Sequence, residues 1–174
     1  MAEPAPGPAI SLSEARLVQR LRSGEPAALR ELWTRWQGPV WAVCRAMADD
    51  RAAGVQLLAR LDAELGAQSR SWQEDRPLCC AVAAWLLTSL KRELQLPDPA
   101  GIHSPLPGAV QRVDQQSAQQ RLSALPPETR LVYLVDLMFR CPASLTAELT
   151  GWSEDQIRAA RANAAWALVA AEGA

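Results

Sequence analysis

The sequence predicts an all-helical protein of two small helical domains, and three observations lead to this prediction. Apolar residues recur at intervals of three and four along most of the chain, which is the period of one helical face. Helix-start signals are dense, as where Ser11 and Glu14 have the form of a capping box. Residues 97–108 hold four prolines and two glycines, a composition typical of a linker. We therefore expect a disordered tail over 1–10, helical domains over 11–96 and 112–174, and a Pro/Gly linker over 97–111.

The first two helices of the N-terminal domain follow from local signals. The first begins after Ser11, and a break over residues 23–26 ends it. Pro26 suits the first turn of the second helix, where no backbone N–H is needed. We expect Pro39 to kink or split this second helix. The inward-facing residues of the two helices are predicted to be Leu17, Val18, Leu21, Leu29, Leu32, Trp33, Trp36, Val40, Val43 and Met47.

Two further helices complete this domain. Asp49-Asp50 is a candidate cap for the third helix, and a polar loop over residues 68–75 follows it. Asp75, with Pro77 in the first turn, is expected to cap the fourth helix, which ends near Leu96. The predicted buried positions are Val55, Leu58, Leu61, Leu65, Leu78, Val82, Trp85, Leu86, Ser89 and Leu94.

The C-terminal domain has the pattern of a helix-turn-helix preceded by one further helix. Pro126-Pro127 opens the first helix, and Cys141-Pro142 ends it. A short helix over 144–149 and a turn over 150–152 lead to a second capping box, formed by Ser153 with Gln156. The last helix is expected to reach about Ala170, and the predicted inward-facing residues are Leu131, Leu134, Val135, Met138, Ile157, Ala160, Ala164 and Leu168.

Composition and charge weigh against a strongly basic nucleic-acid binder. The formal net charge is −1, and residues 121–174 carry five basic and six acidic residues. Seven tryptophans stand beside one Phe and one Tyr, so Trp and Leu must supply most of the core. We expect Trp33, Trp36 and Trp41 to pack in that core, although an exposed patch for a protein partner is the alternative. The low surface charge is also compatible with a dimer.

No enzymatic or metal site is predicted. The four cysteines fit no metal-binding or disulfide spacing, so we expect reduced thiols that fill space: Cys44, Cys79, Cys80 and Cys141. His103 is the single histidine, and it stands in the linker without a catalytic neighbour. The sequence has no Gly-rich phosphate loop, so we expect no cofactor. With no apolar run long enough for a membrane span and no secretion signal, we expect a soluble cytoplasmic protein.

Four stretches with a distinctive order and spacing suggest a family. They are residues 17–33, Arg76-Pro77-Leu78 followed by Ala84-Trp85-Leu86, residues 122–130, and residues 149–153 followed by Ile157-Arg158. Together they resemble the bacterial sigma factors of the extracytoplasmic-function group, over nearly the whole chain. The resemblance implies a two-domain protein without enzymatic activity that directs RNA polymerase to promoters. It also implies three partners: RNA polymerase core, promoter DNA and a regulator of the anti-sigma kind.

The resemblance implies DNA-binding residues in both domains. In the loop over 68–75, Trp72 would stack an unpaired base and Arg70 would hold a phosphate. Along the fourth helix, Arg76, Lys91 and Arg92 would follow a DNA strand. The alternatives are that Trp72 folds back onto the core and that Lys91-Arg92 is the solvated end of a helix.

Two more sets of candidate residues follow from the same resemblance. Arg158 and Arg161 would contact phosphates from the last helix, unless Arg158 instead pairs with Glu154 one turn earlier. On the third helix, the implied contacts with polymerase are Arg51, Gln56 and Arg60, for which an ordinary solvated face is the alternative.

Several positions depart from the family pattern on its functional surfaces. Ala52-Ala53-Gly54 and Leu57-Leu58 stand where the family has acidic residues and a Gln-Glu pair. Ala160, Asn163 and Ala165 occupy positions where the family has arginines. Two hypotheses therefore remain. The chain is a sigma-like initiation protein, or it is a degenerate relative that serves as a protein-interaction module.

Overall fold

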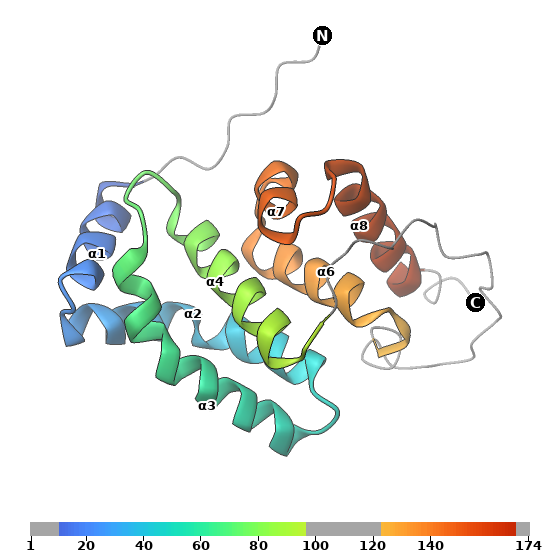
Figure 1. Ribbon diagram of the computed structural model, residues 1–174, viewed down its shortest axis with the longest axis horizontal. Coiled ribbons are helices and arrows are strands. Elements are labelled where there is room, and N and C mark those ends of the chain that lie inside the picture. Colours follow the sequence, from blue (N-terminus) through green and yellow to red (C-terminus); the bar gives the residue numbers. More distant parts are fainter. Residues whose placement is uncertain (1–10, 97–122, 170–174) are drawn as a thin grey trace, which may run out of the picture.

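The computed structural model describes residues 11–96 and 123–169, and in these ranges the chain forms helices and no strands (Figure 1). This confirms the predicted all-helical fold class. The predictions for the tail, for the linker with His103 and for residues 112–122 lie outside the described residues. No helix within the described ranges combines the length and apolar character that crossing a membrane requires.

The first two helices begin where the sequence predicts. Helix α1 (Leu12–Arg22) starts at a capping box, in which the Ser11 hydroxyl accepts a bond from the Glu14 amide at 3.2 Å. Helix α2 (Pro26–Met47) continues through Pro39, so of the two expected effects, a kink or a split, the split is wrong. Packing explains the continuity, because Leu32 before the proline and Val40 after it are both buried in the core. This burial offsets the cost of about 3 kcal/mol that an internal proline imposes.

Helix α3 (Arg51–Gln68) buries Leu61 and Leu65 as predicted, but the predicted burial of Val55 is wrong. Asp50 caps it, with its carboxylate 2.7 Å from the Ala53 amide. Val55 is 51% exposed and Leu58 half-buried, whereas Gly54, Leu57, Leu61 and Leu65 face the core. Packing against α2 accompanies this choice of face: Gly54 lies beside Trp41, and an added Cβ would sit 3.4 Å from the Trp41 ring, about van der Waals contact.

A single turn and one long helix complete the N-terminal half. The 3-10 turn η1 (Ser69–Ser71) follows α3, and α4 (Leu78–Glu93) begins after Pro77. The predicted cap at Asp75 is wrong, because the N-cap is Pro77 and no side chain in the described part of the chain caps this helix. A residue that precedes a proline is driven toward extended backbone, so the helix begins only beyond Pro77.

The C-terminal helices are α6 (Pro127–Phe139), α7 (Ala143–Thr150) and α8 (Glu154–Val169). Gly151, at φ +74°, ends α7 in the left-handed conformation that glycine adopts without strain. The predicted capping box then opens α8, with the Ser153 amide 2.8 Å from the Gln156 side-chain oxygen. A small apolar cluster holds α8 against α6 and α7, and its buried members are Val132, Trp152, Ile157 and Ala160.

The C-terminal helices pack directly on the N-terminal half, with α6 beside α2 and α4 (Figure 1). The buried residues of α6 join the same core as α1 to α4; they include Leu131, Leu134, Val135 and Phe139. Across this seam the rings of Trp36 and Phe139 stack with centroids 5.2 Å apart. Trp33, Trp36 and Trp41 are partly buried against the core, as the core-packing prediction states. The four cysteines are free.

Candidate nucleic-acid interface

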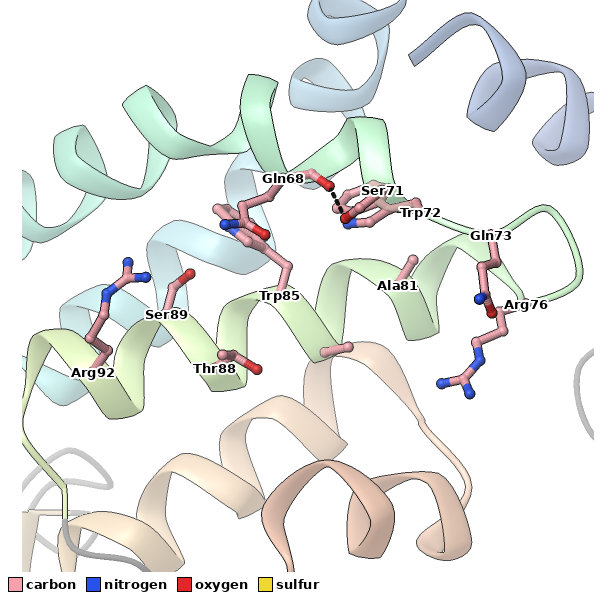
Figure 2. A pocket seen from close by; sticks show the side chains of 11 residues that line it. Gln68, Ser71, Trp72, Gln73, Arg76, Ala81, Trp85, Thr88, Ser89 and Arg92 are labelled. Carbon is pink, nitrogen blue, oxygen red and sulfur yellow. Dashed lines mark hydrogen bonds between the residues drawn. The ribbon is translucent and has the colours of Figure 1, made fainter. Parts of the chain in front are cut away.

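A groove of about 360 Å³ lies between the end of α3, η1 and α4 (Figure 2). Short local bonds shape its upper wall: the Ser71 hydroxyl donates to the Gln68 carbonyl at 2.8 Å, and Ser69 is buried beneath. From α4, side chains spaced by three and four residues form the opposite wall. The lining residues are Gln68, Ser71, Trp72, Gln73, Arg76, Ala81, Ala84, Trp85, Thr88, Ser89 and Arg92.

Two indoles lie at the base of this groove. Trp72 is 8% exposed and Trp85 is 5% exposed, and both belong to the hydrophobic core. The burial favours the alternative in which Trp72 folds back onto the core, because only a small part of its ring reaches the groove. Trp85 Nε1 is buried and has no hydrogen-bond partner among the described residues. A donor of this kind gains free energy when an acceptor reaches it.

Arg76 and Arg92 stand at opposite ends of the groove (Figure 2). Arg92 pairs with Glu64 of α3. Arg76 lies 3.2 Å from Glu148 of α7, so its partner comes from the C-terminal helices. Each cation of the groove is therefore already paired with a carboxylate of this chain.

The other two cations predicted for this site lie elsewhere. Arg70 does not line the groove; its guanidinium lies over the turn between α1 and α2, 3.5 Å from the position of a Cβ on Gly24. Lys91 lines a narrow crevice between α4 and the C-terminal helices, beside Leu131 and Trp152. Neighbouring positions on a helix point about 100° apart, which separates Lys91 from Arg92. Of the five predicted N-terminal DNA contacts, the structure brings together Trp72, Arg76 and Arg92.

The two arginines of α8 lie in different surroundings. Arg158 is exposed and pairs with Glu154 at 2.7 Å and Asp155 at 2.6 Å, which is the arrangement that the alternative prediction states. Arg161 is 26% exposed, pairs with Asp136 of α6 and donates to the Cys141 carbonyl at 3.0 Å. Burial raises the pKa of Asp136, and the Arg161 charge opposes that rise. Arg161 therefore ties α8 to α6.

The predicted polymerase contacts lie on the outer side of α3. Arg51, Gln56 and Arg60 are all exposed, and Arg60 pairs with Glu93 of α4 at 2.9 Å. Val55 adds an exposed apolar side chain between them. This side of α3 is therefore accessible to solvent and combines charged, amide and apolar side chains.

Sequence reasoning missed several residues of the site. Thr88 and Ser89 follow Trp85 at three and four positions, and the predicted Arg92 follows it at seven, so a helical period from that tryptophan would have found this wall. Glu148 is 72 positions from Arg76 in the chain, and no local signal marks the pair. Among the described residues, no cluster of His, Cys, Asp or Glu has the arrangement of a metal site.

Comparison with known proteins supports the fold. No protein-family model and no curated protein matches the chain. Among solved structures, the chain is similar to CnrH in its complex with the cytosolic domain of CnrY, at a TM-score of 0.64 and 13% identity. The alignment covers 91% of this chain and 96% of that one. The chain has a sigma-factor-like fold of the extracytoplasmic-function type. At this identity the likeness establishes the fold alone.

Proposed function

We propose that this chain is a sigma-factor-like transcription initiation protein that binds RNA polymerase core and a melted strand of promoter DNA. The observation that supports it is the groove between α3 and α4 on a sigma-like fold. Arg76 and Arg92 stand at its ends, two indoles form its base, and amide and hydroxyl side chains line it between them. Cations that follow a backbone, combined with aromatic and polar groups for bases, suit single-stranded nucleic acid.

In this proposal the outer side of α3 is the polymerase-binding surface. Arg51 and Gln56 are exposed there, and the Arg60–Glu93 pair is accessible at the surface. A regulator of the anti-sigma kind is a further proposed partner, by analogy with CnrH, whose structure is a complex with the cytosolic domain of CnrY. Such a protein works in the cytoplasm.

The α8 helix contributes little to DNA affinity in this proposal. Its two described arginines are paired within the chain, Arg158 on its own helix and Arg161 with Asp136. For duplex DNA, each phosphate contact adds only about 0.9 to the slope of the logarithm of the binding constant against the logarithm of salt concentration. One exposed arginine therefore makes a small electrostatic contribution to affinity. The same pairing favours the second candidate function, a protein-interaction module that keeps the sigma-like scaffold without promoter binding.

Titration with a fluorescent single-stranded oligonucleotide tests the proposal. We expect binding that weakens as salt increases, and Arg92→Gln to reduce the slope against the logarithm of salt by about 0.7, the value for one contact with a single strand. Arg35→Gln is the matched control. Arg35 is 45% exposed against 53% for Arg92, and it pairs with Glu31 away from the groove. Equal slopes for the two variants would assign the groove no role, and an absence of binding would favour the interaction module.

A further inference from the structure

One ion pair joins the groove to the C-terminal helices. Arg76 lines the groove, and its acidic partner Glu148 belongs to α7. The other groove cation, Arg92, is paired with Glu64 inside the N-terminal half. Nearby, Glu74 is paired with Arg22 at 3.1 Å. Arg76 is therefore the groove cation whose pairing depends on where the C-terminal helices lie.

We infer that docking of α7 on α4 regulates the groove, because Glu148 and an entering phosphate compete for the Arg76 guanidinium. This inference rests on the proposed function and concerns the regulation of that same site. Both partners of the pair are exposed, Arg76 at 42% and Glu148 at 61%, so the bond is weak and exchanges readily. A carboxylate beside the guanidinium also repels a phosphate that approaches the same end of the groove. Docked helices and bound single strand thus oppose each other.

The contact between the C-terminal helices and the N-terminal half is held mainly by apolar residues. Loss of the ion pair therefore weakens the docking of these helices without unfolding the chain. Phe139 stacks on Trp36, and Arg130 reaches the Ala46 carbonyl at 3.4 Å. An exposed ion pair changes an equilibrium constant by at most about fivefold. Coupling between two binding equilibria is reciprocal. The factor by which weaker docking of the C-terminal helices raises the affinity for the strand therefore equals the factor by which a bound strand weakens that docking.

Two thiols at the seam report its opening. Cys80 at the start of α4 is 3% exposed, and Cys141 between α6 and α7 is 4% exposed, and both belong to the shared core. The neighbouring Cys141 thiol, together with burial, raises the pKa of Cys80 to about 11, whereas Cys79 opposes that rise. A buried, protonated thiol reacts slowly with an alkylating reagent until the seam opens.

The test compares Glu148→Gln with Glu154→Gln, which makes the same charge change on α8 at an acid paired with Arg158. We expect Glu148→Gln to bind a fluorescent single-stranded oligonucleotide about two- to fivefold more tightly than wild type. We also expect it to speed alkylation of Cys141, followed by peptide mass spectrometry, by a similar factor. Glu154→Gln should change neither. In an Arg76→Gln background the effect of Glu148→Gln on affinity should vanish, because the cation for which the two anions compete is gone.

The outcomes separate this inference from the proposed function. If wild type and Glu148→Gln bind the oligonucleotide with equal affinity, the proposed function stands and the competition is overturned. If Glu148→Gln strengthens binding equally in the Arg76→Gln background, the effect is one of general charge and the competition is again overturned. If neither protein binds, the proposed function fails and the inference fails with it. In that case a faster reaction of Cys141 shows only that Glu148 holds the seam.

Discussion

Two arginines on α8 allow a matched test of how the C-terminal helices use their charges. Arg161→Met keeps the long stem but removes the pair with Asp136 and the bond to the Cys141 carbonyl. Both Arg161 and Asp136 are less than a third exposed, and leaving such a carboxylate unpaired costs about 1–3 kcal/mol. Arg158→Met removes exposed pairs within one helix, worth about 0–0.5 kcal/mol. The free energy of unfolding should therefore fall by about 0.5–3 kcal/mol more in Arg161→Met than in Arg158→Met.

Urea denaturation followed by circular dichroism measures both variants. The difference between the free energies of unfolding of the two variants should depend on pH. Burial already raises the pKa of Asp136, and loss of Arg161 raises it further. A carboxyl with a raised folded-state pKa stabilises the fold most when it is protonated, and this contribution is lost as pH rises through that pKa. The deficit of Arg161→Met should thus narrow as the pH is lowered from neutral. Equal losses in the two variants, or a deficit independent of pH, would refute the structural role given to Arg161.

Three further predictions address the fold. Leu57→Ala should lower the free energy of unfolding by about 2–5 kcal/mol and Val55→Ala by less than about 0.5 kcal/mol; the reverse order in urea titrations would contradict the observed face of α3. Ser153→Ala should lower the free energy of unfolding by about 1 kcal/mol through loss of the cap, and an unchanged urea midpoint would show that α8 does not depend on this cap. The folded-state pKa values of Cys44 and Cys80 are raised to about 12 and about 11, so stability should decline as pH rises above 9, and a flat profile would show that these thiols are not buried.

The features that the sequence predicted well are local ones. A capping box needs a hydroxyl and a carboxyl or amide three residues apart, and both predicted boxes form, at Ser11 and at Ser153. The helical class follows from the repeat of apolar residues, as in α1, where Leu17, Val18 and Leu21 are buried. Such signals act within one or two turns, so no knowledge of the rest of the chain is needed.

The features that the sequence predicted poorly depend on distant contacts. In α3 both Val55 and Leu57 are apolar and the remaining positions are rich in alanine, so the sequence did not show which side turns inward. Packing of α3 on α2 and α4 turns Leu57 inward and leaves Val55 exposed. The pairing of charges in the groove was equally hard to predict, because the partner of Arg76 comes from α7, far along the chain. Burial of Trp72 likewise depends on how η1 returns to the core.

A sigma-like function requires binding to RNA polymerase core, and this binding can be measured on the full chain. The full chain would be mixed with core enzyme that lacks a sigma factor, separated by size-exclusion chromatography, and the complex assayed for transcription on promoter templates. We expect co-elution and a promoter-dependent transcript, and we expect charge reversal at Arg51 on the outer side of α3 to weaken co-elution. If the chain elutes apart from the polymerase and supports no transcript, the proposed function is wrong, and the sigma-like scaffold serves another function.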